Sequence, residues 1–269
     1  MQRILLVAIA VVLGVVVAPR GLDAASEGPA RNPVLVELFT SEGCSSCPPA
    51  DAFLQKLDRQ PVGGAEVIVL SEHVDYWNHI GWKDPYSASF YSDRQNAYGS
   101  RFGLSGVYTP QMVVDGAAQF VGSDQVLGEA AIRKAENNPK IDVRLSAVSL
   151  PAPGELRAHI EAAELAPSLG QGEVDVYLAI ALDHAESQVS GGENAGHKLA
   201  HTAVVRKIVK VGVLKQGHSF AQDLRVKLDS GMDPNNLRLI AFLQEPHQGK
   251  VFGMAMAPLT VGAQAQNHN

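Results

Sequence analysis

The chain has 269 residues, of which 46% are hydrophobic and 19% are charged, and its formal net charge is −6. This length allows one large or two ordinary domains, and the composition describes a soluble globular protein. The acidic balance excludes the basic surface that nucleic-acid binding requires, so we expect no nucleic-acid partner.

Residues 1–24 have the layout of a secretory signal peptide. Arg3 precedes an uncharged apolar run over residues 4–18, and small residues at 24–26 offer a cleavage region. The run is short for a membrane span, and an uncleaved N-terminal anchor is the alternative. We therefore expect a periplasmic or secreted protein with no stable membrane span after signal cleavage.

Strands and helices alternate in the first half of the mature chain, over residues 33–138. The expected elements are a strand over 34–40, a helix from Pro48 or Pro49 to 57, a strand over 66–74, a helix over 87–102, a hairpin over 111–121 that turns at Asp115-Gly116, and a helix capped by Ser123 that ends near 136.

The pattern changes near residues 137–141 to short alternating runs that are separated by turn signals. Seven strands are expected, over 141–147, 155–161, 173–183, 202–211, 219–228, 237–244 and 250–255. Such a series suggests a second, β-sandwich-like domain over 140–260, and we expect a disordered tail over 262–269.

The two cysteines of the chain form a Cys-x-x-Cys motif, Cys44-Ser45-Ser46-Cys47, between the first strand and the first helix. A thiol at a helix N-terminus faces unpaired N–H groups and the positive end of the helix dipole, which favour its reactive thiolate form. A disulfide across so short a loop would stabilise the fold by only about 2 kcal/mol, against ~4–5 kcal/mol for a loop of about 100 residues. The motif therefore favours a thiol–disulfide redox centre, with a structural disulfide and metal binding as alternatives.

The order of elements over about residues 33–138 resembles the thioredoxin fold. Two landmarks carry the resemblance: Cys44–Cys47 at the start of the first helix, and Thr109-Pro110 just before the hairpin. The resemblance implies that Pro110 is cis and that Thr109 faces the sulfurs, where both residues would bind substrate. The expected fold class is thus an α/β thioredoxin-like domain followed by an all-β, sandwich-like domain.

Five segments are also similar to an uncharacterised family of secreted bacterial proteins that is known only as a domain of unknown function. They are residues 36–51, 73–77, 81–84, 108–114 and 192–196. The chain departs from ordinary thioredoxins at Gly43, where an aromatic residue is usual. Glu37 is the nearest candidate for the buried acid that assists proton transfer in that fold, and a carboxylate at a strand edge is the alternative.

Several other side chains are candidates for supporting roles. His73 and Asp75 follow a buried strand, where ligands collect in open α/β sheets, so they would line the rim beside Cys44. A structural His–Asp pair is the alternative, and it is the one that we favour. The glycine-rich run over 191–196 lacks the spacing of a phosphate loop, and we expect it to pack on the first domain. His197 and His201 are four residues apart, but no metal site is expected there.

The sequence thus predicts an extracytoplasmic thiol–disulfide oxidoreductase-like protein that acts on protein or small thiol substrates. Cys44 would be the attacking thiol and Cys47 the resolving thiol, and no cofactor is expected because electrons pass between cysteine pairs. The alternative is a non-catalytic binding module on a thioredoxin scaffold that handles copper or another metal.

Overall fold

A computed structural model describes residues 32–169 and 172–259 of the chain. The expected signal peptide over 1–24 and the expected tail over 262–269 lie outside the described residues. Within the described part, none of the helices has the length and apolar character that crossing a membrane requires.

The described elements follow one another in an order that begins with alternating strands and helices and ends with strands. They are β1 (Pro33–Thr40), α1 (Pro48–Arg59), β2 (Glu66–His73), α2 (Ser89–Phe102), β3 (Gln111–Val114), β4 (Ala118–Val121), α3 (Gln125–Ala135), β5 (Val143–Ala152), β6 (Glu155–Ala162), β7 (Glu173–Gln188), β8 (Lys198–Lys215), β9 (Phe220–Lys227), a 3₁₀ turn (Pro234–Asn236), β10 (Leu237–Gln244) and β11 (Val251–Pro258).

Each element expected from the sequence is present. The hairpin over 111–121 and the strand over 237–244 have the expected ends, and the other elements differ at one or both ends. The turn between β3 and β4 uses Asp115 and Gly116, both at positive φ, as a two-residue hairpin turn requires. Helix α3 is capped by Asp124 and not by Ser123, because the Asp124 carboxylate accepts a hydrogen bond from the Leu127 N–H at 3.0 Å.

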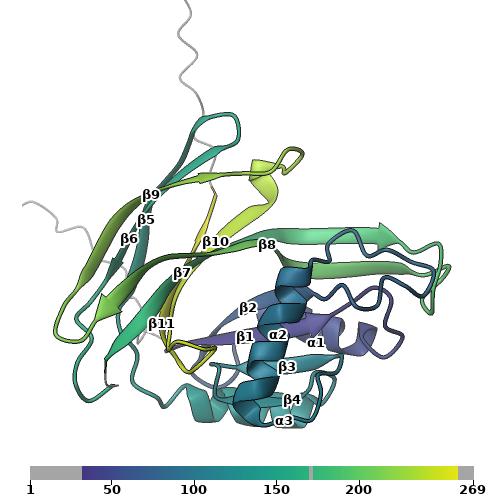
Figure 1. The fold of residues 1–269 in the computed structure, drawn as a ribbon, viewed down its shortest axis with the longest axis horizontal. Helices are drawn as coiled ribbons and strands as arrows, with labels where there is room; N and C mark the ends of the chain where they lie inside the picture. Colours follow the sequence, from purple (N-terminus) through teal and green to yellow (C-terminus); the bar gives the residue numbers. More distant parts are fainter. Residues whose placement is uncertain (1–31, 170–171, 260–269) are drawn as a thin grey trace, which may run out of the picture. The chain divides into compact units, whose positions relative to one another are not determined.

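The strands form one large mixed sheet and one small sheet (Figure 1). The large sheet has eight strands in the order β11-β10-β7-β8-β2-β1-β3-β4, and the small antiparallel sheet has the order β5-β6-β9. β1 and β2 are parallel, and β8 continues the sheet beyond β2 through a parallel pairing at Ser71 and Val204.

The expected fold class is therefore wrong. Strands from the second half of the chain extend the sheet that carries β1 to β4, so the protein is mostly β and is not a thioredoxin-like α/β domain followed by a β-sandwich. Strands β7 and β8 have 16 and 18 residues, longer than the strands of a sandwich that the sequence suggested. Their length lets one hairpin contribute to three different cores.

Strand β8 is covered on both faces where it joins β2. Ala203 packs in the core that contains α1, whereas Val205 packs in the core that contains Tyr91 of α2. Five consecutive residues, 201–205, are buried, which is typical of a central strand and not of a strand with one solvated face.

The two faces of the large sheet carry different helices. α1 and α3 pack with Val34, Val36 and Leu38 of β1. Since side chains alternate along a strand, Leu35 and Phe39 face the other way, toward Tyr91 and Tyr98 of α2.

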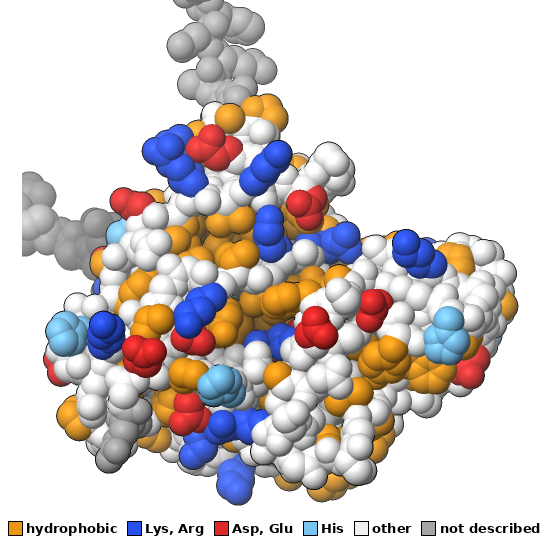
Figure 2. Space-filling view, viewed as in Figure 1, with side chains coloured by type: hydrophobic (Ala, Val, Ile, Leu, Met, Phe, Trp, Pro, Cys, Tyr) orange, Lys and Arg blue, Asp and Glu red, His pale blue; other side chains and the backbone are white. Residues whose placement is uncertain are grey.

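A third hydrophobic core lies between the small sheet and strands β7, β10 and β11. It is built from aliphatic side chains such as Leu156, Ile160, Leu178 and Leu239, all of which are fully buried or nearly so. On the face drawn in Figure 2, hydrophobic side chains gather toward the middle, and basic and acidic side chains are interspersed around them.

Candidate functional site

Cys44 and Cys47 form a disulfide in the turn between β1 and α1, with their Cα atoms 5.4 Å apart. The turn is closed by main-chain hydrogen bonds from the Cys44 N–H to Ser41 and from the Cys47 N–H to Cys44, both 3.1 Å. Cys47 is the N-cap of α1, and Pro48 and Pro49 occupy its first two positions, where a missing N–H costs nothing.

The main-chain N–H groups of this helix end are already engaged. The prolines have none, and the N–H groups of Ala50 and Asp51 donate to the Cys47 carbonyl at 2.8 and 3.1 Å. The Ser46 hydroxyl is the polar group that contacts a sulfur, at 3.4 Å from Cys44 Sγ. The hydroxyl, together with the helix dipole, is therefore the local group placed to stabilise a thiolate on Cys44.

Both sulfur-bearing residues are buried, at 1% exposure for Cys44 and 0% for Cys47. Ser45 and Ser46, between them, are exposed. The disulfide is thus buried, and the two residues that connect its cysteines lie at the surface.

Thr109 and Pro110 lie near the turn, and Trp77 connects them to it. The Thr109–Pro110 peptide bond is cis, as the resemblance implied. The Trp77 indole N–H donates to Thr109 Oγ1 at 2.8 Å. A Cβ atom at Gly43 would lie 3.1 Å from Cβ and 3.4 Å from the carbonyl oxygen of the same tryptophan, so Trp77 takes up the space that a larger residue before Cys44 would need.

Glu37 is not brought to the cysteines. It lies on the face of β1 that α2 covers, where its carboxylate accepts hydrogen bonds from Arg94 Nε and Nη2 at 2.8 and 2.5 Å and from the Tyr98 hydroxyl. A second buried carboxylate, Glu72, lies 3.5 Å from Arg94. Burial raises the pKa of Glu72 well above its ordinary value, and the nearby Arg94 offsets this only in part.

His73 and Asp75 bind different partners in the structure. His73 Nδ1 lies 2.7 Å from Asp84 Oδ2, and the Asp75 carboxylate accepts a hydrogen bond from the Ser92 hydroxyl of α2 at 2.6 Å. Asp84 Oδ2 also accepts the Glu42 N–H at 2.8 Å, so the His73–Asp84 pair holds the main chain that leads into the cysteine turn. Burial opposes the charge of Asp84, but its contacts with His73 and the main chain lower its pKa.

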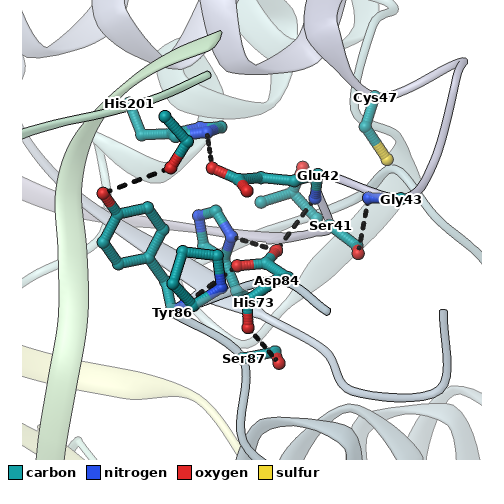
Figure 3. A network of polar contacts seen from close by, with 12 residues as sticks. Ser41, Glu42, Gly43, Cys47, His73, Asp84, Tyr86, Ser87 and His201 are labelled. Atoms are coloured by element: carbon teal, nitrogen blue, oxygen red, sulfur yellow. Dashed lines mark hydrogen bonds and ion pairs between the residues drawn. The ribbon is translucent and has the colours of Figure 1, made fainter. Parts of the chain in front are cut away.

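A second buried histidine, His201 of β8, lies between two carboxylates of the cysteine region. Its Nε2 is 3.4 Å from Glu42 Oε1 and its Nδ1 is 3.6 Å from Asp51 Oδ1. Burial alone would lower the pKa of His201, but Asp51 and Glu42 outweigh it and raise the pKa to about 10. Figure 3 shows His201 pointing at Glu42, with the His73–Asp84 pair beside it, and the two imidazole centroids are 4.7 Å apart.

The loop between β7 and β8, residues 189–197, lies on the cysteine turn. The Asn194 side-chain amide donates to the carbonyls of Glu42 and Cys44 at 2.8 and 3.0 Å. The Glu193 carboxylate accepts the Ser45 N–H at 3.0 Å. The glycine-rich run thus packs on the cysteine region, as we expected.

The sequence interpretation missed Glu42, Asp51, Asp84 and the role of His201. One signal was available: Asp51 is four residues after Cys47 in a helix whose apolar face includes Leu54, which places this acid on the buried side. Within residues 32–169 and 172–259, no group of three or more histidine, cysteine or acidic side chains is arranged to hold a metal ion.

The chain belongs to a family of proteins of unknown function, DUF1223, whose model matches residues 35–244. It is similar to the crystal structure of an Agrobacterium tumefaciens protein, with 26% sequence identity and a TM-score of 0.65 over 87% of this chain and 97% of that one. It also has the fold of HBP35 of Porphyromonas gingivalis, at 16% identity and a TM-score of 0.64, over 90% of this chain and 81% of that one. No curated protein matches the chain.

Proposed function

We propose that the Cys44–Cys47 pair performs thiol–disulfide exchange with a protein or small thiol partner outside the cytoplasm. The observation that carries the proposal is the disulfide itself, set in a turn whose main chain is held by two other segments. Asp84 binds the Glu42 N–H, and in the β7–β8 loop Asn194 binds two carbonyls and Glu193 binds the Ser45 N–H.

A purely structural role explains this arrangement poorly. The disulfide closes a loop of only four residues, so its contribution to stability is about 2 kcal/mol. The turn is already fixed by its own hydrogen bonds and by these two segments, and a further constraint adds little to them.

Exchange with the oxidised pair takes two steps. A partner thiolate attacks Cys44 Sγ, the Cys44–Cys47 bond breaks, and Cys47 leaves as a thiolate that takes up a proton. A second thiolate of the partner then attacks the partner's own sulfur in the mixed disulfide and releases Cys44, which is protonated in turn. The partner loses two electrons and two protons, and the cysteine pair gains them; in reverse, the reduced pair reduces a partner disulfide.

The test is a redox titration of the full mature chain in glutathione buffers, combined with the rate of its reduction by dithiothreitol. We expect a reduction potential above about −300 mV, in the range of reactive disulfides. A potential below this value, with exchange no faster than that of oxidised glutathione, would assign the disulfide a structural role. The Cys47→Ala variant should trap a mixed disulfide on Cys44, whereas Cys44→Ala should trap less.

A further inference from the structure

The β7–β8 loop packs against the cysteine turn through polar contacts with the main chain of that turn. Asn194, which is only 6% exposed, donates to the carbonyls of Glu42 and Cys44. The exposed Glu193 carboxylate accepts the Ser45 N–H. These contacts use main-chain groups at and beside Cys44: the carbonyl of Glu42, the carbonyl of Cys44, which also accepts the Cys47 N–H, and the N–H of Ser45.

The loop has its own internal structure, so it can move as a unit. The Gly196 N–H donates to Val189 at 2.8 Å and the His197 N–H donates to Asn194 at 3.1 Å. The main chain of the loop at Gly191 lies against the main chain at Gly81. A Cβ atom at Gly191 would lie 2.2 Å from the Gly81 carbonyl oxygen. At Gly191 the loop therefore contacts the segment at Gly81 by close main-chain approach, while the Asn194 side chain supplies its buried polar contact with the cysteine turn.

Exchange requires a partner sulfur to approach Cys44 Sγ, and Cys44 is 1% exposed in this arrangement. The bonds that hold the loop are the kind that water or another chain replaces at little net cost, because each lost hydrogen bond is exchanged for a new one. Because Asn194 and Glu193 bind main-chain groups beside Cys44, displacement of the loop would release the turn that holds this buried sulfur.

We propose that the β7–β8 loop occupies the binding site of an extended partner segment that flanks the partner's cysteine. Glu42, Cys44 and Ser45 offer two main-chain acceptors and one main-chain donor, which an extended chain satisfies with its own N–H and C=O groups. The partner displaces Asn194 and Glu193 and takes over their bonds. The inference rests on the proposed exchange reaction, and it names a peptide segment of a protein as the substrate class.

The first test compares full-length mature variants in which the loop contacts are removed. Asn194→Asp keeps the size of the side chain but replaces the donor with an oxygen that faces two carbonyls. Glu193→Ala removes the surface contact at an exposed position, so it tests the loop in a variant that keeps its fold. His197→Ala is the matched control, since this exposed side chain lies in the same loop.

We expect dithiothreitol to reduce Asn194→Asp at least tenfold faster than the unmodified chain. The increase should be smaller for Glu193→Ala, and the rate of His197→Ala should change less than twofold. Reduced samples should show the same order in iodoacetamide labelling. Equal rates for all four chains would overturn the loop's gating role even where the unmodified chain proves redox-active. Faster labelling of the variants, with no exchange activity in any chain, would support the gate and reject the proposed function.

The second test addresses the occupant. The probes are an octapeptide with one central cysteine and the same peptide N-methylated at the residues on both sides of the cysteine, which removes main-chain donors. We expect the unmethylated peptide to form a mixed disulfide with the Cys47→Ala variant at least tenfold faster. Equal rates for the two peptides would overturn the assignment of a peptide-binding site.

Discussion

The buried histidine of β8 makes the stability of the protein depend on pH in a defined direction. His201 has a pKa of about 10 in the folded chain, against an ordinary value of 6.5. The protonated ring is therefore favoured by folding, and its contribution is complete below pH 6.5. It is lost as the pH rises from 6.5 through 10, because the unfolded chain releases this proton first.

The magnitude follows from the difference between the two pKa values. Each pH unit between them corresponds to ~1.4 kcal/mol, so the total loss is ~5 kcal/mol. His201 is 2% exposed, so solvent does not screen its two carboxylate contacts as it screens a surface pair. A loss of this size is a large fraction of the stability of an ordinary domain.

The assay is urea unfolding followed by circular dichroism at pH 7, 8 and 9, on the chain without residues 1–24 and on its His201→Gln variant. The unmodified chain should lose ~1.4 kcal/mol per pH unit relative to the variant, which lacks the titrating ring. His197→Gln is the control, because His197 is exposed. Its free energy of unfolding should follow that of the unmodified chain at each pH. Parallel free-energy curves for the unmodified chain and His201→Gln would refute the reasoning.

Three further outcomes are expected. Arg94→Leu should lower the free energy of unfolding by about 3–5 kcal/mol in urea titrations, because it leaves buried carboxylates unpaired; a loss below ~1 kcal/mol would show that they are neutral without it. Ser46→Ala should slow iodoacetamide labelling of reduced Cys44 at pH 7 about fivefold, as the loss of a hydrogen bond of ~1 kcal/mol implies, and an unchanged rate would exclude its hydroxyl from stabilising the thiolate. Gly191→Ala should speed dithiothreitol reduction at least tenfold, because the added methyl group collides with the Gly81 carbonyl and unseats the loop; a rate equal to that of the unmodified chain would contradict that packing.

Local structure could be predicted from the sequence because local signals determine it. Apolar spacing located α1, and Asp115-Gly116 located the β3–β4 turn. Assembly could not be predicted in the same way. The run from His201 to Val205 is as compatible with a sandwich strand as with a central strand, and only its pairing with β2 decides between them.

In the candidate site, too, local features could be predicted from the sequence and contacts between distant segments could not. The cysteine pair and the cis proline could be placed from short motifs, whereas the buried polar groups around them come from distant segments. His201 reaches Glu42 across 159 positions of sequence, and Asn194 reaches the same residue across 152. Nothing in the local sequence of either residue specifies these partners, because the contacts exist only once β8 lies beside β2.

The addition of β8 to β2 also bears on how the chain can be divided. A fragment that stops before residue 140 would leave β2 as an open edge and would remove most of the core in which Ile68 and Leu70 pack. Long, flat, apolar edges recruit strands from other molecules. Such a fragment is expected to aggregate when expressed, so the cysteine centre should be studied in a chain that keeps all the described strands.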